Sequence, residues 1–190
     1  MSDYYFDIET YSKTPKPDLN NDEIIAITYQ HIDSRTGEIK DGLNILKSWE
    51  LSEKGILKRF IELYNPSDRW SFIPIGFNLS GFDFISLIYR LKKYGIEVRA
   101  TQFFDHPYID MQHVLFLCNK GSFKGCNLDK FAGKESLGSV VLEKYDQKDY
   151  SVIEEYIKNE AEKFIKLYQF LVNRLPEVWL EYANLNNLQT

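Results

Sequence analysis

The chain has 190 residues and a mass of 22.4 kDa, with 44% hydrophobic and 27% charged residues, which fits one globular domain spanning residues 1–190. No apolar run approaches the roughly 20 residues that span a bilayer and no signal peptide opens the chain, so we expect an intracellular, cytoplasmic protein with no membrane partner. The net charge of −5 argues mildly against a polyanion partner for the chain as a whole. Cys118 and Cys126 lack a metal-type CxxC spacing and are expected to be free thiols.

The first half of the chain predicts an antiparallel meander. Residues 3–9 have the alternating pattern of a strand, and residues 23–33 and 38–46 predict two more strands joined by a turn over 34–37. After the meander, helical periodicity and short apolar runs predict alternating elements: a helix over 52–64 closed by Asn65-Pro66, a strand over 72–78, a helix over 81–95, a strand over 96–100 and a long helix over 151–174 closed by Pro176. This order indicates an α/β fold with a mixed sheet flanked by helices.

The first candidate motif is "FDIET". In a strand Tyr5, Asp7 and Glu9 share one face, and two neighbouring carboxylates repel each other unless cations neutralise them. An edge strand whose acidic face lies in water is the simpler explanation of so short a pattern.

The second motif is "GFNLSGFD", at the junction of a predicted strand and helix. Asn78, Phe82 and Asp83 gather here. A capping box, with Ser80 as the N-cap and Asp83 three residues later, explains the acid without a functional role, and a capping carboxylate can still face a metal.

The third motif is "YIKNE" in the long helix. Glu160 falls within the apolar stripe of that helix, between Ile157 and Phe164, and Tyr156 lies one turn earlier on the same side. A carboxylate on a buried helix face needs a cation or a hydrogen-bond donor. A salt bridge to a lysine, or an edge position that reaches water, is the alternative.

Taken together, Asp7, Glu9, Asp83 and the Tyr156-x-x-x-Glu160 pair have an order and spacing that resemble the DnaQ-like (DEDD) 3′–5′ exonuclease superfamily. The resemblance is greatest to the tyrosine subclass, which includes the proofreading domains of family B DNA polymerases. It covers most of the chain, with further echoes in "IDMQHVL" and "KGSFKGCNLDKFA". The family usually has Asp at the last position, where this chain has Glu160.

The resemblance implies a ribonuclease H-like fold and a catalytic set of Asp7, Glu9, Asp83, Tyr156 and Glu160. The four carboxylates would hold two Mg²⁺ or Mn²⁺ ions per site, since hard cations prefer oxygen ligands. Asp7 would bridge both ions, Glu9 and Glu160 would hold the ion that activates water, and Asp83 would support the second. Tyr156 would orient the attacking water.

The implied substrate is single-stranded DNA or a frayed 3′ end, with RNA as an alternative and a polymerase or repair protein as a further partner. Residues 84–134 carry eight basic and four acidic residues, so a local basic surface can exist on this acidic chain, although solvated lysines explain the count equally well. Basic grooves and aromatic faces hold single strands. We expect nucleic-acid contacts from Thr10, Tyr11, Asn78, Phe82, Lys120, Lys124 and Lys130, with Phe77, Phe103, Phe104 and Phe123 as further stacking candidates.

Two other functions fit the same residues. One is a catalytically weak or inactive exonuclease-fold module that binds nucleic acid, and the other is an RNA-directed exonuclease on the same fold. Divalent-ion binding that depends on Asp7 separates the first from a working enzyme, and parallel DNA and RNA digestions separate the second.

Overall fold

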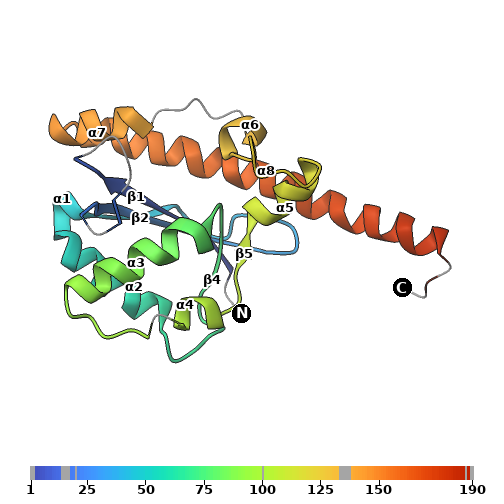
Figure 1. Ribbon diagram of the computed structural model, residues 1–190, viewed down its shortest axis with the longest axis horizontal. Helices are drawn as coiled ribbons and strands as arrows, with labels where there is room; N and C mark the ends of the chain where they lie inside the picture. The colour runs from blue at the N-terminus through green and yellow to red at the C-terminus, as the bar shows by residue number, and fades with distance from the viewer. Residues whose placement is uncertain are drawn as a thin grey trace.

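A five-stranded mixed sheet forms the centre of the molecule (Figure 1). The computed structural model describes residues 3–13, 18–19, 21–99, 101–132, 138–186 and 188. The sheet order is β3-β2-β1-β4-β5. Antiparallel pairing joins β1 to β2 and β2 to β3, whereas β4 runs parallel to β1 and β5 runs parallel to β4. The strands are β1 (Asp3–Tyr11), β2 (Glu23–Ile32), β3 (Asn44–Lys47), β4 (Ile73–Gly76) and β5 (Ile109–Asp110).

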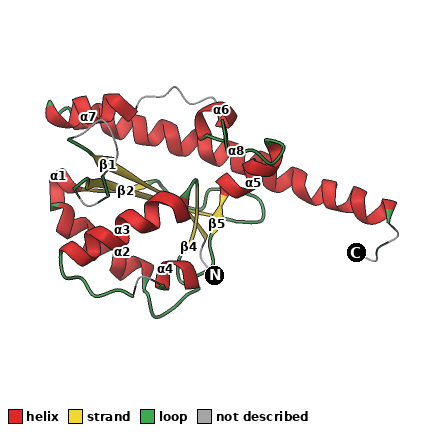
Figure 2. Cartoon of the chain, viewed as in Figure 1, coloured by secondary structure: helices red, strands yellow, loops and turns green. Residues whose placement is uncertain are grey.

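Helices cover both faces of this sheet (Figure 2). The described helical segments are α1 (Ser48–Leu51), α2 (Glu53–Tyr64), the π-helical turn η1 (Leu79–Asp83), α3 (Phe84–Lys93), α4 (Gln102–Asp105), α5 (Met111–Cys118), α6 (Leu128–Ala132), α7 (Gly138–Asp146) and α8 (Tyr150–Leu185). Within the described ranges, no helix combines the length and the apolar character needed to cross a membrane.

The alternation of β1 decides which core each of its side chains joins. Phe6 and Ile8 point into the core that α2 and α3 close, together with Phe60 and Leu87. Tyr5 points to the other face and packs in the core that α8 closes. Asp7 and Glu9 follow Tyr5 at the two-residue period and therefore face α8. The predicted mixed α/β sheet with its antiparallel meander is confirmed.

Two predicted strands differ from the structure. Residues 96–99 form no strand, and residue 100 lies outside the described part of the chain. Ile96 and Val98 bury their apolar side chains against the core beside α3, and the Ile96 amide donates to the Leu91 carbonyl at the helix end. Their apolar character therefore reflects packing on a helix, not pairing in the sheet.

The strand predicted over 38–46 is shorter than expected and begins only at Asn44. Before it, Asp41 interrupts the pairing, because its carboxylate accepts from the His31 amide and its carbonyl accepts from the side chain of Gln30. The first part of this segment meets β2 only in an isolated bridge between Ile32 and Ile39, not in a continuous ladder.

The last helix is longer than predicted, because α8 passes through Pro176 and ends at Leu185. Proline removes one hydrogen bond, to the carbonyl of residue 172, and costs about 3 kcal/mol in a helix interior. The segment after Pro176 contains strong helix formers such as Leu180, Glu181 and Ala183, and it continues as helix beyond that single gap.

Candidate metal-binding active site

β1 carries the first two acids of the site to a place where the sheet opens. β4 pairs with β1 only over Asp3 to Tyr5, so Asp7 and Glu9 lie beyond the end of that pairing. On its other side β1 continues along β2, with Asp7 opposite Thr28 and a register shift immediately after Glu9. Bulges of this kind commonly re-aim side chains next to functional sites. Both carboxylates are half-buried.

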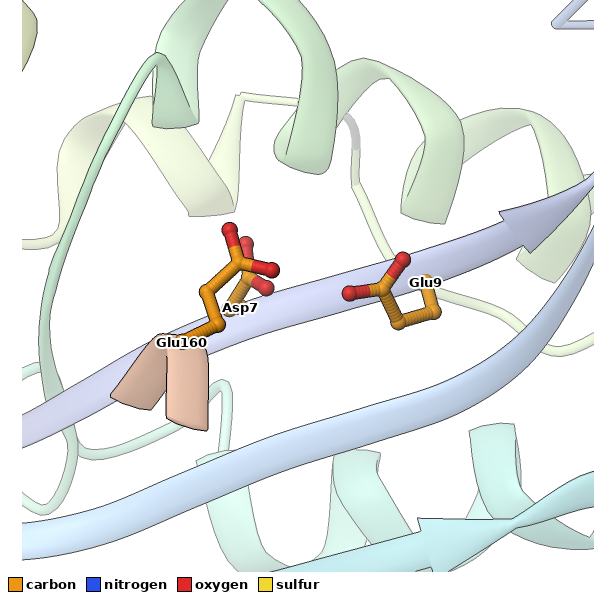
Figure 3. A group of neighbouring side chains, drawn as sticks. All are labelled: Asp7, Glu9 and Glu160. Atoms are coloured by element: carbon orange, nitrogen blue, oxygen red, sulfur yellow. The ribbon is translucent and has the colours of Figure 1, made fainter. Parts of the chain in front are cut away.

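α8 brings the third acid to the same place from 150 residues further along the chain. Glu160 is only 9% exposed, and Ile157, Ala161 and Phe164 around it are buried against the sheet, as the helical stripe predicted. One carboxylate oxygen from each of Asp7, Glu9 and Glu160 lies within 4.8 Å of the other two (Figure 3). These three residues, widely separated in the sequence, form the central cluster of the candidate site.

Tyr156 lies one turn before Glu160 on α8, and its hydroxyl is hydrogen-bonded to the Glu160 carboxylate. Burial raises the pKa of this hydroxyl far above its usual value, and the charges of Glu9 and Glu160, the hydrogen bond to Glu160 and the charge of Asp7 act in the same direction. The phenol therefore stays neutral at physiological pH and keeps its proton available for hydrogen bonding.

Asp83, in η1, is hydrogen-bonded to the segment of β1 that carries Asp7 and Glu9. It is 2% exposed, and its Oδ1 accepts from the amide of Ile8 at 3.2 Å, between the two acids of β1. Burial above all, and then the charge of Asp7, raise the pKa of this carboxyl well above its usual range, although hydrogen bonds from its own amide and that of Ile8 act against the shift. Within the described residues, the group of three close carboxylates does not include Asp83.

The turn that carries Asp83 depends on residues with special backbone geometry. Asn78 precedes η1 in the left-handed region with φ 60°, which asparagine tolerates better than most residues. A Cβ on Gly76 would collide with the Phe6 carbonyl of β1, and one on Gly81 would collide with the Asn78 side chain. The expected capping box is wrong, because Ser80 lies inside the π-helical turn and Asn78 occupies the N-cap position.

Asp110 fastens this turn to the end of the sheet. Its Oδ1 accepts from the amides of Asn78 at 2.9 Å and Gln112 at 3.1 Å, and its Oδ2 accepts from the amide and the hydroxyl of Ser80, both at 3.1 Å. The bond to Gln112 is the N-cap of α5. One carboxylate therefore both caps α5 and holds the turn at η1.

Tyr5 is the neighbour of the cluster that sequence reasoning did not single out. Its ring packs on Phe164 of α8 with 4.9 Å between centroids, beneath the acids. Burial raises the pKa of its hydroxyl, as do the charges of Asp7, Glu160, Glu9 and Asp83. The period of β1 already placed Tyr5 on the acidic face, so its position was available from the sequence.

The residues expected to contact nucleic acid lie in two regions. Near the cluster, Thr10 and Tyr11 follow Glu9 on β1, and Asn78 and Phe82 belong to the turn at η1. The Tyr11 hydroxyl donates to Asp146 of α7 at 2.6 Å, and Phe82 is partly buried against the core beneath α3. Phe103 is wrong as a stacking candidate, because it is 1% exposed and packs between Tyr64 and Phe84.

The second region is the loop between α5 and α6 together with α6 itself: the loop exposes Lys120 and Lys124, and α6 exposes Lys130. Asn119 organises it: its amide nitrogen donates to the Lys124 carbonyl at 3.2 Å, and its Oδ1 accepts from Nζ of Lys130 at 2.7 Å. Asn119 therefore joins the loop that carries Lys124 to Lys130 of α6. Lys134, which contributed to the predicted basic stretch, lies outside the described residues.

The donor set of the cluster fits a hard divalent cation. Ligands on opposite sides of Mg²⁺ lie about 4.2 Å apart, because Mg–O distances are about 2.1 Å. Three oxygens within 4.8 Å of one another are therefore close to the spacing of a single coordination sphere. A bound cation would also offset the mutual repulsion of these carboxylates, which otherwise costs free energy in a site this enclosed.

Comparison with solved structures places the fold among exonucleases. E. coli exonuclease I in complex with a dT13 oligonucleotide has a TM-score of 0.59 at 13% identity over 96% of this chain and 43% of that one. The zinc-bound form of the E. coli exonuclease I–ssDNA complex has a TM-score of 0.57 at 12% identity over 96% of this chain and 42% of that one. The expected ribonuclease H-like fold is therefore confirmed.

Sequence comparison gives a shorter match. DNA polymerase 2 of Aeropyrum pernix is 32% identical over 93 residues, which make up 49% of this chain and 10% of the polymerase. No family model matches the chain. The chain thus corresponds to a tenth of that polymerase and to less than half of exonuclease I.

Proposed function

We propose that this protein is a divalent-metal-dependent 3′–5′ exonuclease of the DnaQ-like tyrosine subclass, which removes nucleotides from the 3′ ends of single-stranded DNA. The observation that carries the proposal is the convergence of Asp7 and Glu9 from β1 with Glu160 from α8, with oxygens within 4.8 Å. The hydrogen bond from Tyr156 to Glu160 supports the assignment to the tyrosine subclass.

The carboxylates of Asp7, Glu9 and Glu160, with Asp83 beside Asp7, would hold two Mg²⁺ or Mn²⁺ ions. Bound ions of this kind neutralise the negative charge that develops on phosphate and leaving oxygens during phosphodiester hydrolysis. Tyr156 is neutral and fixed by Glu160, so its hydroxyl can orient the attacking water. Glu160 itself is longer than the usual aspartate, but its position on the buried stripe of α8 directs its carboxylate to the oxygens of β1.

Substrate binding would follow the residues around the cluster. Thr10, Asn78 and Phe82 flank the acids on β1 and at η1, and the lysines of α6 and of the loop before it offer charge for phosphates. Exonuclease I shares this fold in complexes with single-stranded DNA, and the sequence match is to a DNA polymerase. Both support DNA as the first substrate to test and a polymerase as a partner.

The test is the digestion of a 5′-labelled single-stranded oligonucleotide in Mg²⁺ or Mn²⁺, with a parallel RNA strand. We expect a ladder of progressively shorter labelled DNA products, absence of activity in chelator, and loss of activity in Asp7→Asn and Glu160→Gln. Glu155→Gln is the matched control, because it removes a charge from an exposed position on the same helix. Equal background cleavage by wild type and Asp7→Asn refutes the enzyme assignment. A ladder on RNA alone would reassign the substrate.

A further inference from the structure

The last four turns of α8 extend past the rest of the molecule (Figure 1). Up to Leu171 the inward stripe of this helix is buried against the sheet and the shorter helices. Beyond it lies a segment that we call the C-terminal arm, residues 173–185. There the large apolar side chains are exposed, including Val178 at 59%, Leu185 at 77% and, beside them, Trp179. Soluble monomers rarely leave so continuous an apolar surface uncovered.

The apolar positions of the arm continue the spacing of the buried part of α8. They recur at alternating intervals of three and four residues along one face of the helix: Tyr168, Leu171, Leu175, Val178, Tyr182 and Leu185. This interval is the heptad pattern by which one helix packs against another. The first two members are buried by the protein's own core, whereas the last four have no covering element among the described residues.

An apolar groove lies beside the point where the arm leaves the core. It has a volume of about 480 Å³ and lies between α8 and the helices α5 and α6, with Leu115, Phe131, Leu167 and Leu171 among its lining residues. Lys163 and Lys166 of α8 also line it.

We propose that the C-terminal arm pairs with the arm of a second copy of this chain in an antiparallel, two-fold symmetric dimer. Charge selects the register. Arg174 comes directly before Leu175, and Glu181 comes directly before Tyr182, so both occupy the position that flanks the apolar seam. In an antiparallel pair, this flanking position of one helix faces the same position of the other helix. Aligning Arg174 of each copy with Glu181 of the other forms two identical interhelical ion pairs.

The same register sets Leu175 of each arm against Val178 of the other. It brings the last turn of each helix, with Leu185, to the level of Tyr168 in the other copy, where the arm leaves the core. Because both copies contribute the same arm, the contact closes on itself and produces a dimer, not a filament.

Sedimentation equilibrium or light scattering on the full 190-residue chain tests this directly. We expect a mass that rises with concentration towards twice 22.4 kDa. Arg174→Glu or Glu181→Arg alone creates two like-charge contacts and should weaken the dimer at least tenfold. The double variant Arg174→Glu/Glu181→Arg restores the pairs with reversed polarity and should recover wild-type association.

The control addresses the ion pair that Arg174 already forms with Glu177 on its own helix. Glu177→Gln removes this pair without touching the proposed interface and should leave the dimer intact. Val178→Glu, at an exposed position where folding is not at stake, should give a monomer. A wild-type chain that is monomeric at all concentrations overturns the proposal, as does a dimer that the single charge reversals leave unchanged. The readout is independent of metal and of nuclease activity.

Discussion

Asp7→Asn should have opposite effects on stability with and without a divalent ion. In the metal-free protein Asp7 is close to two other carboxylates, and unit charges 4.8 Å apart repel by about 3.5 kcal/mol at an effective dielectric constant of about 20. Because Asp7 and Glu9 are half-buried and partly screened by water, we expect about 2 kcal/mol of relief from the substitution. For a chain of this size that raises Tm by about 4 to 8 °C.

A bound divalent ion should reverse the order of the two melting temperatures, so that wild type becomes more stable than Asp7→Asn. An ion at 100 times its Kd stabilises a site that only the folded state forms by about 2.7 kcal/mol, or roughly 5 to 11 °C in Tm. Wild type should gain this increment in Mn²⁺, and Asp7→Asn should gain little of it. The assay is thermal unfolding followed by circular dichroism, in chelator and in Mn²⁺.

Glu155→Gln serves as the control for charge alone, since it removes a carboxylate from an exposed position of α8. It should change Tm by less than about 2 °C in either buffer, as surface substitutions usually do. The reasoning fails if Asp7→Asn is less stable than wild type in chelator, or if it keeps the full Mn²⁺ increment.

Three further substitutions probe the core on the other face of the sheet and the surroundings of the site. Arg90→Met leaves the buried Glu53 carboxylate without its cation and should cost about 3 to 5 kcal/mol in urea unfolding, whereas a loss under 1 kcal/mol would contradict a structural role for this pair. Asp110→Asn cannot satisfy all four donors that the carboxylate binds and should cost about 2 kcal/mol. It should also slow cleavage, and an unchanged rate would show that the turn it holds does not matter for activity. Lys124→Ala should weaken single-stranded DNA binding and reduce the slope of log K against log salt by about 0.7, with Lys58→Ala on the other face of the sheet as the control.

The site was predictable to the extent that it follows from local periodicity. The two-residue period of β1 gave Asp7 and Glu9 a common face, and the helical stripe of α8 gave Glu160 a buried position. The structure shows that these faces meet. The metal-binding and catalytic roles of these residues stay predictions.

What the sequence could not supply was long-range hydrogen bonding and the choice between two ways of burying an apolar segment. An Asp before a helix predicts a cap, but the hydrogen bonds that Asp110 accepts from Asn78 and Ser80 exist only because β5 lies beside β4. Likewise, Ile96 and Val98 read as a strand, and only tertiary structure shows that they pack against a helix. The prediction that the last helix ends at Pro176 is wrong for a related reason. Strong helix formers after Pro176 outweigh the one backbone hydrogen bond that proline removes.

A calorimetric Mn²⁺ titration of wild type, Glu160→Gln and Glu155→Gln, in the absence of DNA, tests the central claim most directly. Glu160 is the one acid of the three that comes from outside β1. Two ions bound per chain in wild type and in Glu155→Gln, with at least one lost in Glu160→Gln, is the predicted result. Identical titrations for all three proteins would show that the acids of β1 and α8 do not share a metal.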